Sequence, residues 1–255
     1  MTTWQTFDDE VARWREAGRV VELWWRDDDA VDATPALDRL LSVQRRTETP
    51  LALAVVPSRA TPALAERLAS EPGVDLLQHG YAHVNHAPPP DKKTELGPHR
   101  PAMLVLGELG TGWLAMERLF GTRALPVLVP PWNRIAPALV PTLPEIGFTG
   151  LSTFGARGRA EPVRGLRQIN THVDFIDWKG RRGFVGQEAV LAALVRALGH
   201  ARTETGEPVG LLTHHLAMDE GAWDFLVSFC VSANTMPGVK MTSAHEIFAS
   251  REARA

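Results

Sequence analysis

The sequence predicts an α/β fold in which about seven parallel strands form a distorted (β/α) barrel. Short apolar runs alternate with segments of helical periodicity along the chain, which is the pattern of repeated strand–helix units. The 255 residues, of which 44% are hydrophobic, are enough for one barrel with a full core. This number of strands favours a barrel over an open sheet, so we expect a single domain over residues 1–255.

The expected strands are short and rich in aliphatic residues. Five of them are VVELWW (20–25), LALAVV (51–56), VDLL (74–77), LPVLV (125–129) and VGLLT (209–213). The segments 147–155 and 166–178 supply further short strands with loops. A parallel sheet follows because helical patterns separate most successive strands.

Helical spacing is clear near the N-terminus, where Phe7, Val11 and Trp14 fall on one face. Thr34 and Thr61 each precede a proline at the start of an apolar segment, so both are expected to cap helices that follow a strand. Further helices are expected over 101–120, 187–202 and 242–253.

Two segments, 87–101 and 155–165, combine proline, glycine and charge and are expected to be irregular. The first directly follows a group of histidines, and long loops beside such groups often cover a site. The segment 87–101 is therefore a candidate for part of a functional site.

Charge and cysteine content exclude several partners and compartments. The chain has 27 Lys and Arg against 30 Asp and Glu, so no field of one sign favours nucleic acid or an anionic membrane. Cys230 is the one cysteine, so no internal disulfide can form, and it is expected to be a buried small hydrophobe. The N-terminus lacks a secretory signal pattern, and no apolar run is long enough for a membrane span. We expect a cytoplasmic protein that acts on a neutral small molecule or polymer.

Carboxylates and imidazoles follow two of the expected strands. The first strand ends in WWRDDDA, which places Asp27, Asp28 and Asp29 in a row. After the strand VDLL, His79 and His83 lie four residues apart, a spacing at which two imidazoles can share one metal ion. Either group alone is a weak signal, because aspartates after a strand are commonly turn formers and histidine pairs occur without metal.

Three further segments with aromatic or ionisable side chains also follow strands: LVPPWNR (128–134), VDFIDWKG (173–180) and VGLLTHHLAMD (209–219). The carboxyl ends of all strands in a parallel barrel open on one face, so side chains from these five segments can converge there. Two imidazoles and one carboxylate leave a coordination position for water, as in catalytic zinc sites. The sequence therefore predicts a catalytic metal centre.

In this order the five segments resemble the five motifs of the polysaccharide deacetylase superfamily, the NodB-like carbohydrate esterases that include chitin, chitooligosaccharide and peptidoglycan deacetylases. WRDDDA resembles the first motif with its paired aspartates, and HGYAH (79–83) resembles the histidine motif. VPPWN resembles the groove motif, DFIDW (174–178) matches D-x-x-D-W, and LTH (212–214) matches the closing leucine-x-histidine. The resemblance covers roughly residues 20–245.

The resemblance implies a NodB-like barrel and one divalent metal ion, with zinc as the expected ion. The implied metal ligands are Asp29, His79 and His83. Asp28 would be the general base and His214 the general acid, with Asp177 holding the His214 imidazole charged and oriented. The neighbouring His215 is expected to be a packed or capping imidazole, because strand alternation sends only one of the two toward the metal. The implied substrate-binding residues are Arg26, Pro131, Trp132, Trp178 and Leu212.

One departure from the family pattern affects the assignment of the aspartates. The family has an arginine at the start of the third motif, which tethers the catalytic aspartate, whereas this chain has Val129 there. Arg26 is expected to replace it, since side chains two apart on a strand share a face and Arg26 then lies beside Asp28. That parity favours Asp28 as base and Asp29 as ligand. The alternative, Asp27 as base and Asp28 as ligand, follows if the strand ends one residue earlier.

The expected function is removal of an N-acetyl group from a sugar or polysaccharide by metal-activated water, with an aspartate base and a histidine acid. Two alternatives stay open. The lack of a secretory signal favours an amidohydrolase that acts on a small cytoplasmic amide. The altered third motif allows a catalytically silent carbohydrate-binding homologue.

Overall fold

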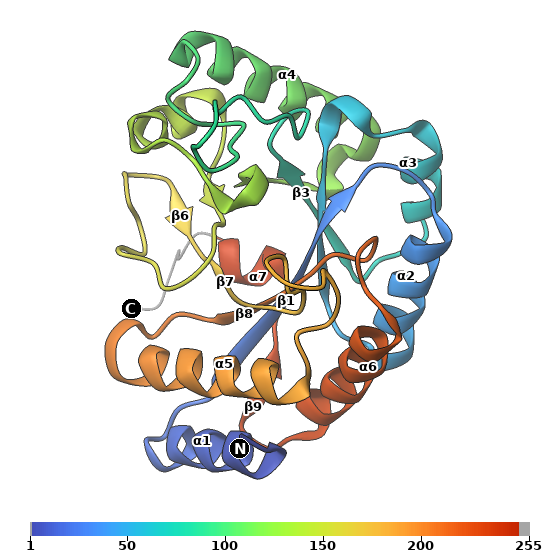
Figure 1. Ribbon diagram of the computed structural model, residues 1–255, viewed down its shortest axis with the longest axis vertical. Coiled ribbons are helices and arrows are strands. Elements are labelled where there is room, and N and C mark those ends of the chain that lie inside the picture. Colours follow the sequence, from blue (N-terminus) through green and yellow to red (C-terminus); the bar gives the residue numbers. More distant parts are fainter. Residues whose placement is uncertain (1, 250–255) are drawn as a thin grey trace.

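A parallel sheet curls into a half-barrel, and most of the helices pack around its outer side (Figure 1). The computed structural model describes residues 2–249. The strand order is β6-β5-β4-β3-β2-β1-β8-β7, with β9 beside the start of β1. This arrangement confirms the expected α/β barrel-like fold.

The strands are β1 (Val21–Ala30), β2 (Leu51–Val55), β3 (Val74–His79), β4 (Ala124–Val129), β5 (Gly150–Leu151), β6 (Arg167–Gln168), β7 (Thr171–Asp174), β8 (Val209–Thr213) and β9 (Val239–Met241). The described chain thus has more strands than the seven expected, because the segment 166–178 divides into β6 and β7 and because β9 was not expected. β5 and β6 contain two residues each, which is too short for a hydrophobic periodicity to reveal them in the sequence.

The helices are α1 (Trp4–Glu16), α2 (Pro35–Thr47), α3 (Pro62–Leu68), α4 (Ala102–Phe120), α5 (Gln187–His200), α6 (Glu220–Thr235) and α7 (Ala244–Phe248). Short 3-10 turns span Pro57–Arg59, Gly121–Arg123, Pro131–Asn133 and Pro137–Ile146, and a π turn (Ala201–Thr205) extends α5. α6 was not expected, because its segment WDFLVSFCV is rich in the aromatic and branched residues typical of strands. The helix expected over 242–253 is seen as α7, and residues 250–255 lie outside the described part of the chain.

The expected helix caps are present. The Thr34 hydroxyl accepts a hydrogen bond from the Leu37 amide at 3.1 Å, and the Thr61 hydroxyl accepts one from the Leu64 amide at 3.2 Å. Each such cap contributes about 1 kcal/mol. They fix where α2 and α3 begin after β1 and β2, and so keep the loop that follows Asp29 in place.

Alternation along β1 divides its side chains between two hydrophobic clusters. Val21, Leu23 and Trp25 belong to the large cluster between the sheet and the outer helices. Trp24 belongs to a smaller cluster inside the half-barrel, where its ring packs against that of Phe248 in α7 with the ring centroids 6.1 Å apart. Even-numbered residues of β1 therefore point into the barrel and odd-numbered residues point toward the helices.

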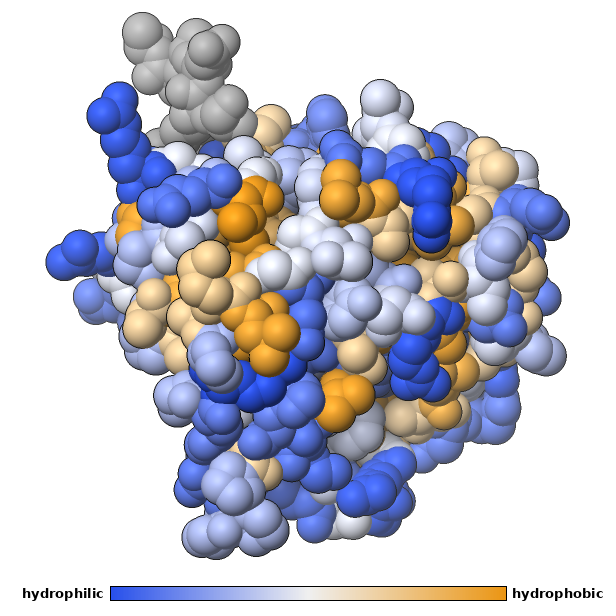
Figure 2. Space-filling view, turned by 90° about the horizontal axis from the view of Figure 1, so that it is seen from above, coloured by the Kyte–Doolittle hydropathy of each residue, from blue (hydrophilic) through white to orange (hydrophobic). Residues whose placement is uncertain are grey.

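The surface carries no single large apolar face in the view from above, where apolar residues form separate patches among hydrophilic ones (Figure 2). Within residues 2–249, no helix has both the length and the apolar character that a membrane crossing needs. The expected loops 87–101 and 155–165 contain no helix or strand apart from isolated bridges at Leu96 and Val163.

Candidate functional site

Three potential metal ligands meet beyond the carboxyl ends of β1 and β3. Asp29 is the penultimate residue of β1, and His79 is the last residue of β3. His83 lies in the turn that follows β3. Asp29 Oδ1 is 3.2 Å from Nε2 of His79 and 3.2 Å from Nε2 of His83. The ligand atoms of all three residues lie within 4.8 Å of one another, so one ion could contact all of them.

The chemistry of these atoms fits a divalent cation. Val129 O can only accept a hydrogen bond, so the 3.0 Å contact with His79 Nδ1 places a proton on that nitrogen. In the neutral imidazole Nε2 then carries a lone pair, which points toward the carboxylate oxygen of Asp29. That oxygen is buried and has no hydrogen-bond partner among the described residues. A cation between the His79 nitrogen and the Asp29 oxygen would remove the repulsion between their lone pairs. In zinc sites the second ring nitrogen of a histidine ligand commonly donates a hydrogen bond that fixes the ring, as His79 Nδ1 does here.

The electrostatics of the cluster also favour a cation. Burial raises the pKa of Asp29, but its close contact with His79 and the charges of the three nearby histidines outweigh that effect, and the pKa falls well below its usual range. Burial lowers the pKa of His79, but the charges of Asp28 and Asp29 raise it above its ordinary value. Burial and the charge of His79 lower the pKa of His83, which favours the neutral, ligating form.

Left-handed backbone conformations aim these side chains. The φ angles of Asp29, Gly80 and His83 are 75°, 57° and 57°. Such angles are uncommon outside glycine and tend to occur at functional sites where the surroundings enforce them. Gly80 also lacks space for a side chain, because a Cβ there would lie 2.5 Å from the Pro131 ring.

The carboxylate of Asp28 is held by Arg26 inside the barrel. Nε of Arg26 donates to Oδ1 of Asp28 at 2.8 Å, and Nη2 donates to Oδ2 at 3.0 Å. The same guanidinium donates to the Ser152 hydroxyl at 2.7 Å and to the Asn133 side-chain oxygen at 2.7 Å. Arg26 thus occupies the tethering position that parity on β1 suggested.

Asp27 points to the opposite side of β1. Its carboxylate accepts a hydrogen bond from Thr213 at 2.6 Å and lies 2.5 Å from Nδ1 of His215. Trp25 Nε1 in turn donates to the Thr213 hydroxyl at 2.8 Å. Both Asp27 and His215 are buried, and their pairing is on the helix-facing side of the sheet. This geometry favours the register with Asp28 as base and Asp29 as ligand over the alternative.

His214 lies on the barrel side of β8, against the ring of Trp178 at a centroid distance of 4.7 Å. Its Nδ1 is buried without a hydrogen-bond partner among the described residues. The nearby carboxyl group is Asp174 in β7. Burial raises the pKa of this carboxyl group above its usual value, although the charge of His214 lowers it in part. Asp174 is held by the Trp178 indole at 2.8 Å and by the Ile176 amide at 2.9 Å.

The expected pairing of Asp177 with His214 stays a prediction, because in this structure Asp177 has other hydrogen-bond partners. The Asp177 carboxylate accepts hydrogen bonds from the amides of Lys179 and Gly180, at 3.3 and 2.9 Å, and so closes a tight turn. The reason is local: β7 ends at Asp174, and the chain then turns at Asp177, within the loop that the antiparallel bridge of Ile176 and Phe184 closes. Asp174 is therefore a second candidate for the carboxylate that acts with His214.

The expected substrate-binding residues divide into buried and accessible ones. Trp178 is 44% exposed, and Trp132 is half-buried with its ring 4.4 Å from that of His83. Pro131 and Leu212 are buried. Arg26 is fully buried and its donors are used internally, so the expectation that it contacts substrate is wrong.

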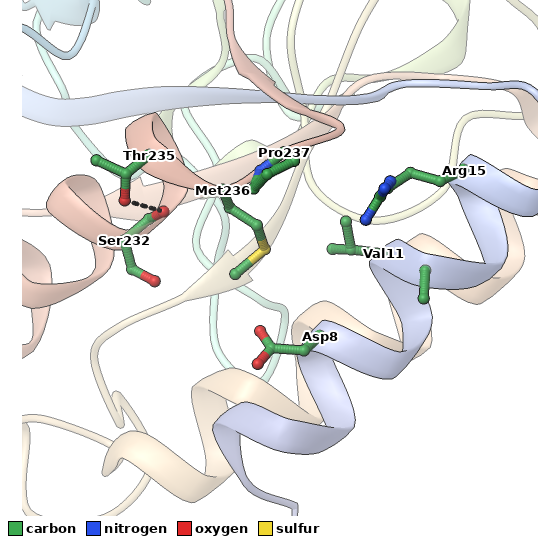
Figure 3. A pocket seen from close by; sticks show the side chains of 8 residues that line it. Asp8, Val11, Arg15, Ser232, Thr235, Met236 and Pro237 are labelled. Atoms are coloured by element: carbon green, nitrogen blue, oxygen red, sulfur yellow. Dashed lines mark hydrogen bonds between the residues drawn. The ribbon is translucent and has the colours of Figure 1, made fainter.

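A cavity of about 580 Å³ borders this site. Asn133, which binds Arg26, lines it together with Thr153, Gln168 and mostly apolar side chains such as Val140 and Leu151. A second cavity of about 350 Å³ lies at the opposite end of β1, where Asp8, Val11 and Arg15 of α1 face Met236 and Pro237 (Figure 3). The two cavities are therefore separate, and the first is connected to the candidate site through Asn133, which binds Arg26.

Sequence reasoning missed several residues of the site. Asn133 and Asp174 lie within the quoted motifs VPPWN and DFIDW, so their positions were visible although their roles were not. The contact of Ser152 with Arg26 and the pairing of Asp27 with His215 could not be predicted from local sequence patterns, because each joins residues more than a hundred positions apart. Glu95, in the loop 87–101, is buried beside Gly80 and also went unrecognised.

No protein-family model and no curated protein matches the chain, whereas solved structures do. A Mycobacterium smegmatis protein assigned to the polysaccharide deacetylases aligns over 91% of this chain and 90% of its own, with 18% identity and a TM-score of 0.68. The peptidoglycan deacetylase PdaC from Bacillus subtilis aligns over 90% of each chain, with 15% identity and a TM-score of 0.56. A family 4 acetyl xylan esterase from Clostridium thermocellum, solved with a cobalt ion, covers 89% and 90%, with 14% identity and a TM-score of 0.53. This chain shares their fold, as the motif resemblance implied.

Proposed function

We propose that this protein is a metal-dependent hydrolase that removes an acetyl group from an N-acetylated sugar. The observation that carries the proposal is the cluster of Asp29, His79 and His83, with the tethered Asp28 beside it. This is a three-ligand set with an adjacent carboxylate, which suits hydrolysis better than structural metal binding. The ion, for which zinc is the best match to the donor set, would polarise the acetyl carbonyl and lower the pKa of water.

The residues of the chain would then divide the proton transfers. Asp28 would take the proton of the attacking water, and Arg26 would hold its carboxylate in position. His214 would protonate the departing amine, with Asp174 rather than Asp177 as its carboxylate partner. A backbone N–H near Trp132, whose ring contacts that of His83, would bind the developing oxyanion.

The choice of a sugar as substrate rests on the accessible aromatic residues and on the structural neighbours. Trp132 and Trp178 flank His83 and His214, where an apolar sugar face can stack on them. The neighbours include a peptidoglycan deacetylase and an acetyl xylan esterase, which act on carbohydrates. A small N-acetyl sugar or an oligosaccharide would fit these features.

A second candidate is hydrolysis of a small, non-polymeric amide. The cavity of about 580 Å³ next to Asn133 favours it, because most of its wall is apolar and a hydrophobic group attached to the amide could enter. The same metal ligands and the same base would serve this reaction. The two candidates therefore differ in substrate and not in chemistry.

Acetate release is the decisive measurement. The apoprotein would be loaded with one equivalent of Zn²⁺ or Co²⁺ and assayed on N-acetylglucosamine, its oligomers and a panel of small aryl and alkyl acetamides. We expect acetate from at least one substrate, and none after chelation or with His83→Ala. A protein that binds metal and oligosaccharide but releases no acetate would instead be a catalytically silent binding protein.

A further inference from the structure

We propose that Glu95 is the positioning residue that builds the histidine side of the metal centre. Its buried carboxylate would hold the turn His79–His83 in the conformation that aims His83 at the ion. The inference rests on the proposed metal centre. It gives a specific role to the loop 87–101, which the sequence marked as a candidate for part of a functional site.

The carboxylate of Glu95 binds the backbone of this turn directly. Oε2 accepts a hydrogen bond from the Tyr81 amide at 3.0 Å, and Oε1 accepts from the Ala82 amide at 2.7 Å and the Val84 amide at 3.5 Å. The three amides lie between the two histidine ligands or directly after the second one. One side chain therefore fixes the orientation of successive peptide groups around His83.

These hydrogen bonds matter because the turn has a backbone conformation that is unfavourable without support from its surroundings. His83 has a φ of 57°, and Gly80 has the same angle at the start of the turn. A non-glycine residue in the left-handed region needs its surroundings to enforce it. The hydrogen bonds that Glu95 accepts from the amides on both sides of His83 supply that enforcement.

The fit is too close for another arrangement. A Cβ built on Gly80 would lie 2.1 Å from Oε2 of Glu95 and 2.5 Å from the ring of Pro131. Two hydrogen bonds hold the backbone at Glu95 in place. The Arg100 side chain donates to the Glu95 carbonyl oxygen at 3.3 Å, and the Ala136 amide donates to the Leu96 carbonyl oxygen at 2.7 Å. The turn is thus clamped between the loop 87–101 and the 3-10 turn Pro131–Asn133.

Glu95 is also a buried negative charge whose described partners are backbone amides and no cation. The neighbouring Arg100 side chain is engaged by Glu108 through two contacts of 2.8 Å. Two neutral imidazoles and the carboxylate of Asp29 neutralise only one of the two charges of a divalent ion. The charge of Glu95, close behind the turn, would offset the second.

Metal affinity measured on the folded apoprotein tests this role. Glu95→Gln keeps the size of the side chain but replaces one accepting oxygen with an NH₂ group and removes the charge. Co²⁺ and Zn²⁺ dissociation constants would be measured by competition with a chromophoric chelator, and folding of each apoprotein would be followed by circular dichroism. We expect Glu95→Gln to weaken metal binding by about 10- to 100-fold while it remains folded.

Glu71→Gln is the matched control. Glu71 is equally buried, but it pairs with Arg45 and Arg67 before the start of β3, at the other end of the strand from His79. Its loss should lower thermal stability and leave the metal dissociation constant unchanged. A folded Glu95→Gln protein with wild-type metal affinity would overturn the inference, and so would an equal loss of affinity in Glu71→Gln.

A second variant keeps the test decisive if Glu95→Gln does not fold. Glu95→Asp retains the charge, but its shorter side chain withdraws the carboxylate from the amides. A loss of affinity of about tenfold or more in Glu95→Asp supports the positioning role, and wild-type affinity refutes it. If the wild-type protein binds no metal at all, the proposed metal-dependent function fails first. That result differs from the case in which only the Glu95 variants behave like wild type.

Discussion

At the scale of single residues, three consecutive aspartates have three different surroundings. Asp27 pairs with His215 on the helix side of β1, Asp28 with Arg26 inside the barrel, and Asp29 lies against the metal-site histidines. The alternation of the strand separates the first two, and the left-handed φ of Asp29 turns the third toward His79 and His83. Identical side chains in one run therefore have distinct expected roles.

Asparagine substitutions should resolve these roles. Asp29→Asn should lower metal content, because it removes the anionic ligand. Asp28→Asn should keep the metal and lower kcat by about 10² or more, as expected for loss of a general base. Asp27→Asn should mainly lower the melting temperature, since it breaks the buried pairing with His215. Metal analysis, initial rates and thermal unfolding of the three variants would check this, and metal loss in Asp28→Asn with retention in Asp29→Asn would reverse the register.

The two late histidines should differ in their dependence on the leaving group. His214→Ala should keep its metal and lose activity on amides, with a smaller deficit on aryl acetates, because a stable leaving anion needs no general acid. His215→Ala should act through stability on all substrates alike, since His215 is buried against Asp27. Rates on an acetamide and on an aryl acetate would separate the two. A leaving-group dependence in His215→Ala, or its absence in His214→Ala, would contradict the assignment.

The same assay distinguishes the two carboxylates of DFIDW. Asp174→Asn should reproduce part of the amide-specific deficit of His214→Ala, because Asp174 lies close enough to His214 for their charges to interact. Asp177→Asn should have little effect on the rate, since Asp177 caps a turn at Gly180. A strong, amide-specific loss in Asp177→Asn alone would restore the pairing that the motif suggested.

At the scale of elements, the loop 155–165 is attached to the sheet by a buried carboxylate. Glu207, just before β8, lies 3.4 Å from Nε of Arg157 and 3.4 Å from Nε2 of His172 in β7. Burial raises the pKa of Glu207, but the hydrogen bond and charge of His172 and the charge of Arg157 outweigh it, so the pKa is lowered. The ionised carboxylate thus holds the loop, β7 and β8 together.

This attachment predicts a pH dependence of stability. Because the folded-state pKa of Glu207 lies below the ordinary value of 4.5, its ionised form stabilises the fold above about pH 4.5. That contribution should be lost as the pH falls through the folded-state pKa. Glu207→Gln should therefore cost on the order of 1 kcal/mol near neutral pH and progressively less below pH 4.5. Denaturant unfolding of both proteins from neutral to acidic pH would measure the difference, and a constant difference would refute the linkage.

At the scale of the whole molecule, the candidate site joins segments that are far apart in sequence. Asp29, His79 and His83 come from the ends of β1 and β3, and His214 comes from the end of β8. A bound ion would link β1 to β3 across the intervening β2. Metal binding should therefore stabilise the folded molecule as a whole, because the ligand set does not exist in the unfolded chain.

Thermal unfolding with and without metal tests this link. At a free metal concentration of 100 times the dissociation constant, the folded state gains about 2.7 kcal/mol. For a domain of this size that raises the melting temperature by about 5–10 °C. A chelator should remove the shift, and His83→Ala should show none. An equal shift in His83→Ala would indicate that the ion binds elsewhere.

The sequence by itself determined the parallel barrel and the set of residues at its carboxyl end, because both follow from local patterns. Strand length, helix caps and the two-residue period of β1 depend on near neighbours, and that period already paired Arg26 with Asp28. Only the tertiary structure decided which side chains from distant segments of the chain lie at the site. Asp174 instead of Asp177 lies near His214 because the chain turns sharply after β7, and Glu95 reaches the His79–His83 turn because the loop 87–101 folds back over it. Such contacts depend on the path of the chain in space, which no short-range pattern encodes.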